Sequence, residues 1–179
     1  MNVYLFERIL GIGILILHVF LVLLIGYLIY RKATKRKINI VENFLSHNGM
    51  WLVAGTSLLA IIGSLIFSDY YGIEPCKLCW IQRIFIYPQA LIMGIAAYAK
   101  DTRAWVYSLW LSIIGFIIGI YQVNGQLGIT EVIPEAECIA GADAACAQVH
   151  MLEFGYITFP FASATLFLFI IILYFFRKK

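Results

Sequence analysis

Five long stretches without a charged residue limit what this sequence can fold into. A helix needs about 20 apolar residues to cross the hydrocarbon core of a bilayer, and all five stretches meet or approach that length. They are Ile9–Tyr30, Met50–Ser68, Ile84–Ala99, Ala104–Tyr121 and Phe154–Phe176. The third is short and reaches a full span by starting near Trp80, which takes Arg83 into its outer end.

Composition excludes the soluble alternatives. The chain has 179 residues, of which 63% are hydrophobic and 13% are charged. In soluble domains about 45–50% of residues are hydrophobic, when nearly the same residue types are counted, and about 25% are charged. A soluble domain of this size cannot bury so much apolar surface, and a disordered chain needs the opposite composition. No stretch shows the alternating pattern of a membrane barrel. The sequence predicts an all-α integral membrane helical bundle.

The basic residues predict how the chain crosses the membrane. Lys and Arg concentrate on the cytoplasmic side of membrane proteins. In the five-helix arrangement one side collects ten of the 13 basic residues: Arg31, Lys32, Lys35, Arg36, Lys37, Lys100, Arg103, Arg177, Lys178 and Lys179. The other side has Arg8, Lys77 and Arg83. We expect a multi-pass protein of the cytoplasmic (inner) membrane, with the C-terminus inside and the N-terminus outside. The loops Asp69–Trp80 and Gln122–Glu153 then face outward.

The basic cluster Arg31–Lys37 follows the first apolar stretch instead of preceding it, so that stretch is predicted to be a retained anchor and not a cleaved signal peptide. This cluster could bind anionic lipid headgroups, but we favour the interpretation that it only fixes the topology. We expect membrane lipid and no nucleic acid as a partner.

All four cysteines fall in the two loops that are predicted to face outward. Cys76 and Cys79 lie in the short loop, and Cys138 and Cys146 lie in the long one. The outside of a cell membrane is where disulfides form and persist. Two pairs are expected, Cys76–Cys79 and Cys138–Cys146, although four cysteines allow three connectivities.

The first pair is a C-x-x-C unit that opens a predicted helix. Pro75 suits a chain that turns into a helix. The N-terminal end of a helix carries partial positive charge, which favours a thiolate, and Lys77 and Arg83 add cationic charge nearby. These features favour a redox-cycling pair over a structural disulfide.

A metal site is the remaining interpretation of the cysteines. Structural zinc sites usually use two short hooks such as C-x-x-C, and the spacing from Cys138 to Cys146 is looser than that. Trp80 follows Cys79, so the C-x-x-C-H haem attachment pattern is absent. We predict no metal.

Electrons taken from thiols need an acceptor, and the sequence has no nucleotide-binding signature and no soluble domain to carry one. A carrier dissolved in the bilayer meets this need. Arg83 lies one helical turn beyond Cys79, on the same face. Its guanidinium could stabilise the anion that forms as a carbonyl accepts electrons. The alternative is an arginine that extends to the lipid headgroups.

The segment from Cys76 to Pro88 reads C-K-L-C-W-I-Q-R-I-F-I-Y-P. It closely resembles the C-x-L-C-W-x-Q-R-I-x-x-Y-P signature of the DsbB/BdbC disulfide bond formation proteins. Cys138 and Cys146, followed by F-G-Y-I-T-F-P at the start of the last stretch, are a second match. The resemblance implies a four-helix domain over residues 50–179. Residues 1–49 would be an extra N-terminal transmembrane helix and a basic cytoplasmic linker.

The resemblance also implies an activity and a role for each site residue. Such proteins reoxidise an extracytoplasmic thioredoxin-like dithiol oxidase of the DsbA type and reduce membrane quinone (ubiquinone or menaquinone), which supports disulfide bond formation. Cys79 would face the quinone with Cys76 as its partner, and Arg83 would hold the quinone. Cys138 would be attacked by the partner protein, and Cys146 would exchange with Cys76.

Two features depart from that pattern, and two residues have simpler interpretations. Ile9–Tyr30 has no counterpart in the four-helix core, and a histidine that some members carry is absent from the segment Y-Q-V-N that begins at Tyr121. His18 is interpreted as a neutral side chain that is hydrogen-bonded to a neighbouring helix, and Gly115-x-x-x-Gly119 is interpreted as a site of close helix packing.

Two other classes of protein compete with the redox interpretation. One is a non-catalytic membrane protein with two structural disulfides, and the other is a membrane protein that binds a metal through four cysteines.

Overall fold

The computed structural model describes residues 2–35, 38–129, 149 and 151–177. They form an all-helical bundle, and their β structure is limited to an isolated bridge between Glu153 and Ile157. The helices are α1 (Val3–Thr34), α2 (Asn39–Leu65), α3 (Lys77–Ala99), α4 (Ala104–Gln126) and α5 (Phe159–Tyr174), with a π-helical turn, η1 (Ile66–Tyr70), continuing α2.

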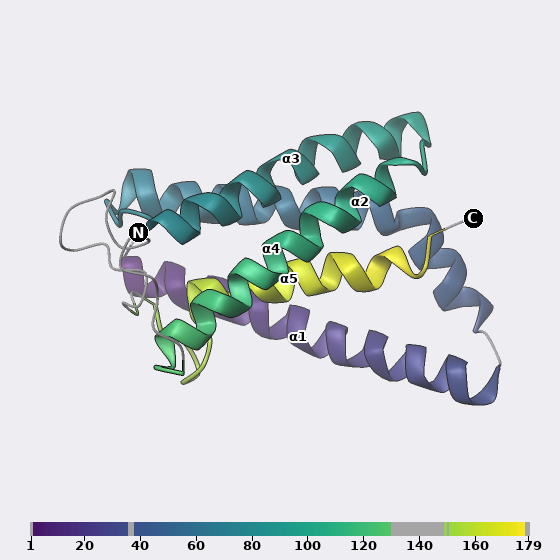
Figure 1. Ribbon diagram of the computed structural model, residues 1–179, viewed down its shortest axis with the longest axis horizontal. Helices are drawn as coiled ribbons and strands as arrows, with labels where there is room; N and C mark the ends of the chain where they lie inside the picture. The colour runs from purple at the N-terminus through teal and green to yellow at the C-terminus, as the bar shows by residue number, and fades with distance from the viewer. Residues whose placement is uncertain (1, 36–37, 130–148, 150, 178–179) are drawn as a thin grey trace.

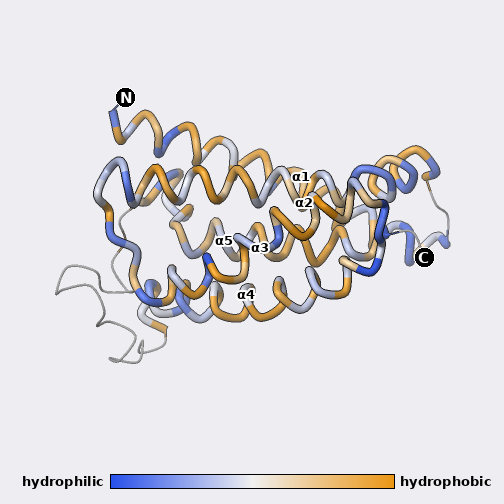
Figure 2. Tube along the Cα trace, turned by 90° about the horizontal axis from the view of Figure 1, so that it is seen from above, coloured by the Kyte–Doolittle hydropathy of each residue, from blue (hydrophilic) through white to orange (hydrophobic). Residues whose placement is uncertain are grey.

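The helices run side by side, and their connections gather at the two ends of the bundle (Figure 1). The start of α1, the end of η1 and the start of α3 share one end with the end of α4 and the start of α5. The α1–α2 and α3–α4 connections lie at the other end with the C-terminus. Apolar residues cover the middle of the bundle and polar residues its two ends (Figure 2), the distribution expected for helices that span a bilayer.

Four of the described helices, counting α2 with η1 as one, are long and apolar enough to cross a membrane. The fifth, α5, is a shorter apolar helix of 16 residues. The predicted all-α membrane bundle is therefore confirmed. The helix bounds differ from the charge-free stretches at two places. Helix α2 begins at Asn39 and not near Met50, because Leu45 and Gly49 in its polar first turns are buried. Helix α5 begins at Phe159 because residues 153–157 form a turn.

Helix α4 approaches α5 closely along its glycine positions. A Cβ atom at Gly115 would lie 2.2 Å from the ring of Phe167, and one at Gly119 would lie 3.1 Å from Ala164. Phe167 is fully buried. Small residues allow such close contact between membrane helices, so the interpretation of Gly115-x-x-x-Gly119 as a packing site is confirmed.

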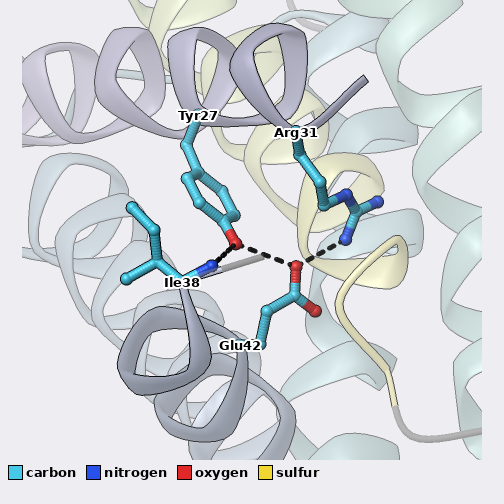
Figure 3. Close-up of polar contacts among 4 residues, drawn as sticks. All are labelled: Tyr27, Arg31, Ile38 and Glu42. Carbon is cyan, nitrogen blue, oxygen red and sulfur yellow. Dashed lines mark hydrogen bonds and ion pairs between the residues drawn. The ribbon is translucent and has the colours of Figure 1, made fainter. Parts of the chain in front are cut away.

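A polar cluster fixes the C-terminal end of α1 against the start of α2 (Figure 3). Arg31 donates a hydrogen bond to Glu42 Oε1 at 2.7 Å, and the Tyr27 hydroxyl donates to the same oxygen at 3.1 Å. The backbone N–H of Ile38 donates to the Tyr27 hydroxyl at 3.1 Å. The side chains of Arg31 and Glu42 are 26% and 20% exposed, so this ion pair is partly shielded from water and from screening by salt.

The middle of α1 is joined to α5 by His18. Its Nε2 lies 2.8 Å from Thr165 Oγ1, while the Thr165 hydroxyl donates to the Phe161 carbonyl. Because the Thr165 hydrogen is directed to Phe161, the Thr165 oxygen accepts from the imidazole Nε2–H. The interpretation of His18 as a side chain bonded to a neighbouring helix is confirmed.

Candidate active site

The C-x-x-C unit forms the start of α3. Cys76 is the N-terminal cap of the helix, and its carbonyl accepts a hydrogen bond from the N–H of Trp80 at 3.0 Å. The two Sγ atoms lie 3.3 Å apart, whereas a disulfide bond is about 2.05 Å long. The pair is therefore present as two thiols and not as a disulfide. Cys76 is buried, and Cys79 is partly exposed.

A side chain from α4 reaches both sulfurs. Gln122 Nε2 lies 3.3 Å from Cys76 Sγ and 3.4 Å from Cys79 Sγ. Gln122 is 2% exposed, so its amide approaches the sulfurs from inside the protein. An N–H donor at this distance stabilises negative charge on sulfur, and therefore a thiolate at either position.

Two further residues hold Gln122 in that position. Its Oε1 accepts a hydrogen bond of 2.7 Å from Gln82 Nε2, and Gln82 is itself buried. The Ser163 hydroxyl of α5 donates to Gln82 Oε1. A chain of hydrogen bonds therefore runs from α5 through α3 to α4 and ends at the two sulfurs. Because buried amides without partners are costly, this chain fixes the three helices relative to one another at the C-x-x-C.

Arg83 lies one turn beyond Cys79 and is held within the protein. Its Nη2 donates to the Ser64 carbonyl of α2 at 3.0 Å, and its guanidinium carbon lies 5.0 Å from the centre of the Trp80 ring. A guanidinium has five N–H donors, and in the described part of the chain one is committed to Ser64. Arg83 is partly buried, so these contacts favour a positioned side chain over one that extends to the headgroups.

A large cavity adjoins these residues. It has a volume of about 730 Å³ and is lined by residues of all five helices and of η1. Cys76, Cys79, Gln82 and Arg83 all lie on its wall, and most of the remaining lining is apolar. Its volume is in the range of small-molecule sites, which combine an apolar wall with a few polar groups. This arrangement can hold a flat, largely apolar molecule beside Cys79.

The structure brings together three of the predicted site residues, Cys76, Cys79 and Arg83. Cys138 and Cys146 lie outside the described residues, so their pairing and roles stay predictions. No group of three His, Cys, Asp or Glu side chains suited to a metal occurs within the described ranges, but the four-cysteine site would need the two undescribed residues.

Sequence reasoning did not assign to the site Gln122, which contacts the sulfurs, or Gln82, which holds Gln122. Gln122 lies within the segment where a histidine was expected and not found, and Gln82 lies within the signature motif. A polar side chain inside an apolar helix was the available signal, because such groups are rare in membranes without a partner.

Comparison with known sequences identifies the family. The profile of the disulfide bond formation protein DsbB family matches residues 46–176. This chain belongs to the DsbB family. It is 37% identical over 137 residues to the probable disulfide formation protein C of Halalkalibacterium halodurans, covering 74% of this chain and 90% of that protein.

The disulfide bond formation protein C of Bacillus subtilis is 41% identical over 124 residues, which cover 68% of this chain and 84% of that protein. A probable disulfide formation protein of Coxiella burnetii is 36% identical over 121 residues, or 68% and 81% of the two chains. No solved structure gives a significant match.

Membership in the DsbB family gives the coarse function. The chain is a multi-pass membrane oxidoreductase of disulfide bond formation. The four helices α2 to α5 lie almost entirely within the matched region, and α1 lies outside it.

Proposed function

We propose that this DsbB-family protein is a thiol:quinone oxidoreductase that reoxidises an extracytoplasmic dithiol oxidase and reduces membrane quinone. Cys79 and Arg83 lie on the wall of the same cavity, which has a volume of about 730 Å³ and is otherwise lined mainly by apolar residues. This observation carries the proposal. A quinone has an apolar ring and tail with polar carbonyl oxygens, and this wall offers it a thiol, a guanidinium and apolar surface together.

The reaction transfers two electrons and two protons. The partner's two thiols become a disulfide, and one quinone becomes a hydroquinone. Cys79, as a thiolate, faces the quinone ring, and Cys76 forms the disulfide with it when the electrons leave. Arg83 stabilises the negative charge that develops on the carbonyl oxygen as it accepts electrons. The amide of Gln122 stabilises the thiolate that forms between these steps.

The second cysteine pair connects this site to the partner. Cys138 receives the attack of a thioredoxin-like, DsbA-type partner, and Cys146 exchanges with Cys76, so each transfer is a thiolate attack on a disulfide sulfur. Both cysteine loops and the N-terminus face the extracytoplasmic side, and the C-terminus faces the cytoplasm. The end of η1 and the starts of α1, α3 and α5 lie at one end of the described bundle, which supports a shared side for the N-terminus and the two loops.

A coupled assay in proteoliposomes tests the proposal. The purified protein receives a reduced thioredoxin-like dithiol protein and either ubiquinone or menaquinone. We expect one hydroquinone for each dithiol oxidised, and loss of this activity with Cys79→Ser. A Cys79→Ser variant that retains quinone reduction would contradict the enzymatic assignment and favour two structural disulfides.

Two further measurements separate the finer roles. Cys146→Ser should allow a stable mixed disulfide between Cys138 and the partner to accumulate, whereas trapping with Cys138→Ser instead would reverse the roles of that pair. Zinc in stoichiometric amount in the purified protein would support the metal-binding alternative.

A further inference from the structure

One wall of the cavity beside Cys79 comes from α1, the helix outside the region that the family profile matches. The lining positions of α1 recur every three or four residues, so they form one stripe along the helix. They include Phe6, Leu10, Gly13, Leu17 and Phe20. The opposite wall on α2 extends from Leu52 to Ser64, about 18 Å of helix.

Contacts at both ends hold α1 against α2. At the outer end the rings of Phe6 and Phe67 have centres 5.2 Å apart, and Leu10 packs against Gly63. At the inner end Arg31 pairs with Glu42 at 2.7 Å. The cavity lies between these two points of attachment, so α1 bridges it and leaves a space instead of packing along α2.

Gly13 lies on this stripe and contributes no side chain to the cavity wall. A Cβ atom there would meet nothing within 4 Å, although Gly13 lines the cavity. Two residues earlier, a Cβ atom at Gly11 would lie 3.0 Å from Glu153. Gly13 is exposed and lines the cavity, so the space beside it is the open part of the cavity, which no described residue fills.

We propose that the stripe of α1 from Leu10 to Phe20 forms the second wall of the quinone site, and that the missing side chain at Gly13 leaves room for the quinone. This inference rests on the proposed function. The polar groups, Cys79 and Arg83, lie on α3, and the stripe of α1 is apolar. Ile9 and Ile16, which also line the cavity, are 53% and 64% exposed, so the cavity reaches the surface that faces lipid along α1. A molecule with a polar ring and an apolar chain fits this combination.

Filling the space at Gly13 tests the inference. The variants Gly13→Ala, Gly13→Leu and Gly13→Phe add increasing volume to the cavity wall. Gly26→Phe is the matched control, because Gly26 lies on the same helix, has nothing within 4 Å of a Cβ atom and does not line the cavity. Two quantities are measured in the full-length protein: the apparent KM for quinone, and the stoichiometric oxidation of the reduced partner in quinone-free detergent.

We expect the KM for quinone to rise with side-chain volume and to reach at least about tenfold for Gly13→Phe, a loss of about 1.4 kcal/mol. Oxidation of the partner without quinone should match that of the wild-type protein, which shows that the variant is folded and its cysteine pairs are intact. A KM for Gly13→Phe within about twofold of that for Gly26→Phe would overturn the inference. A wild-type protein that oxidises the partner but reduces no quinone would overturn the proposed function, and this inference with it.

Discussion

Gln122 Nε2 lies 3.3 Å from Cys76 Sγ, so a buried amide of α4 contacts the residue that begins α3. The same amide lies 3.4 Å from Cys79 Sγ, and its oxygen accepts a hydrogen bond from Gln82. Cys76 and Leu78 form a small buried cluster against which Ile118 and Tyr121 of α4 pack. The position of the redox pair therefore depends on α4 as much as on the helix that carries it.

Replacing Gln122 by Leu should lower both stability and activity. The variant leaves the Gln82 amide buried without its acceptor, which costs about 1–3 kcal/mol, and it removes the donor from both sulfurs. We expect a lower midpoint of thermal unfolding in detergent and a lower kcat for partner-coupled quinone reduction.

Gln89→Leu is the matched control for that variant. Gln89 is likewise a buried glutamine, but it lies on α3, accepts hydrogen bonds from Ser108 at 2.6 Å and Ser112 at 3.2 Å, and does not line the cavity. It should lose stability by a similar amount while the folded fraction keeps its kcat. Equal losses of kcat in the two variants would show that Gln122 acts through stability alone.

The sequence predicted the fold class because the physical limit is simple: apolar helices must satisfy their backbone hydrogen bonds internally within a bilayer. It also predicted that the C-x-x-C opens a helix and that Arg83 lies beside it, since both follow from local spacing. The contact between Gln122 and Cys76 joins residues 46 positions apart. No local pattern encodes such a contact, because it depends on how α3 and α4 pack.

The cavity was beyond sequence reasoning for a related reason. Ile9–Tyr30 is readily recognised as a span, but its hydropathy does not indicate where it approaches α2 and where it does not. Those points are set by individual contacts, such as Phe6 with Phe67 and Arg31 with Glu42. Likewise, the turn at 153–157 shortens α5 within a stretch whose composition alone is continuously apolar.

Arg83→Ala should raise the apparent KM for quinone by about 10- to 150-fold, because it removes one charge-assisted hydrogen bond of about 1.5–3 kcal/mol. Arg83→Lys keeps the charge but not the planar group, so it should recover part of the affinity. The check is steady-state kinetics over a range of quinone concentrations.

Arg103→Ala provides the control for the arginine variants, because Arg103 is exposed and caps the start of α4, which lies at the opposite end of the bundle from the start of α3 (Figure 1). Its KM should equal that of the wild-type protein. Unchanged quinone dependence in Arg83→Ala would mean that this arginine serves only the packing of α3 on Ser64 and Trp80.

His18→Leu should loosen α1 from α5. It removes the hydrogen bond to Thr165 and the weaker contact of Nδ1 with the Tyr156 hydroxyl at 3.4 Å. Hydrogen bonds between membrane helices contribute about 0.6 kcal/mol on average and up to about 1.7 kcal/mol. We expect a loss of stability in that range, measured by unfolding in detergent. The double variant with Thr165→Val should lose little more than His18→Leu alone, and additive losses would contradict a direct interaction.

Gly115→Leu should be the most destabilising of these substitutions. The first added atom would lie 2.2 Å from the Phe167 ring, which is fully buried and has no space to move into. Overpacking of this kind costs about 1–3 kcal/mol and occasionally more. Gly55→Leu is the control, because Gly55 is an exposed helical glycine with nothing within 4 Å of a Cβ atom. We expect Gly115→Leu to unfold at a clearly lower temperature than Gly55→Leu. Similar stabilities would mean that α4 and α5 are not packed through Gly115 and Phe167.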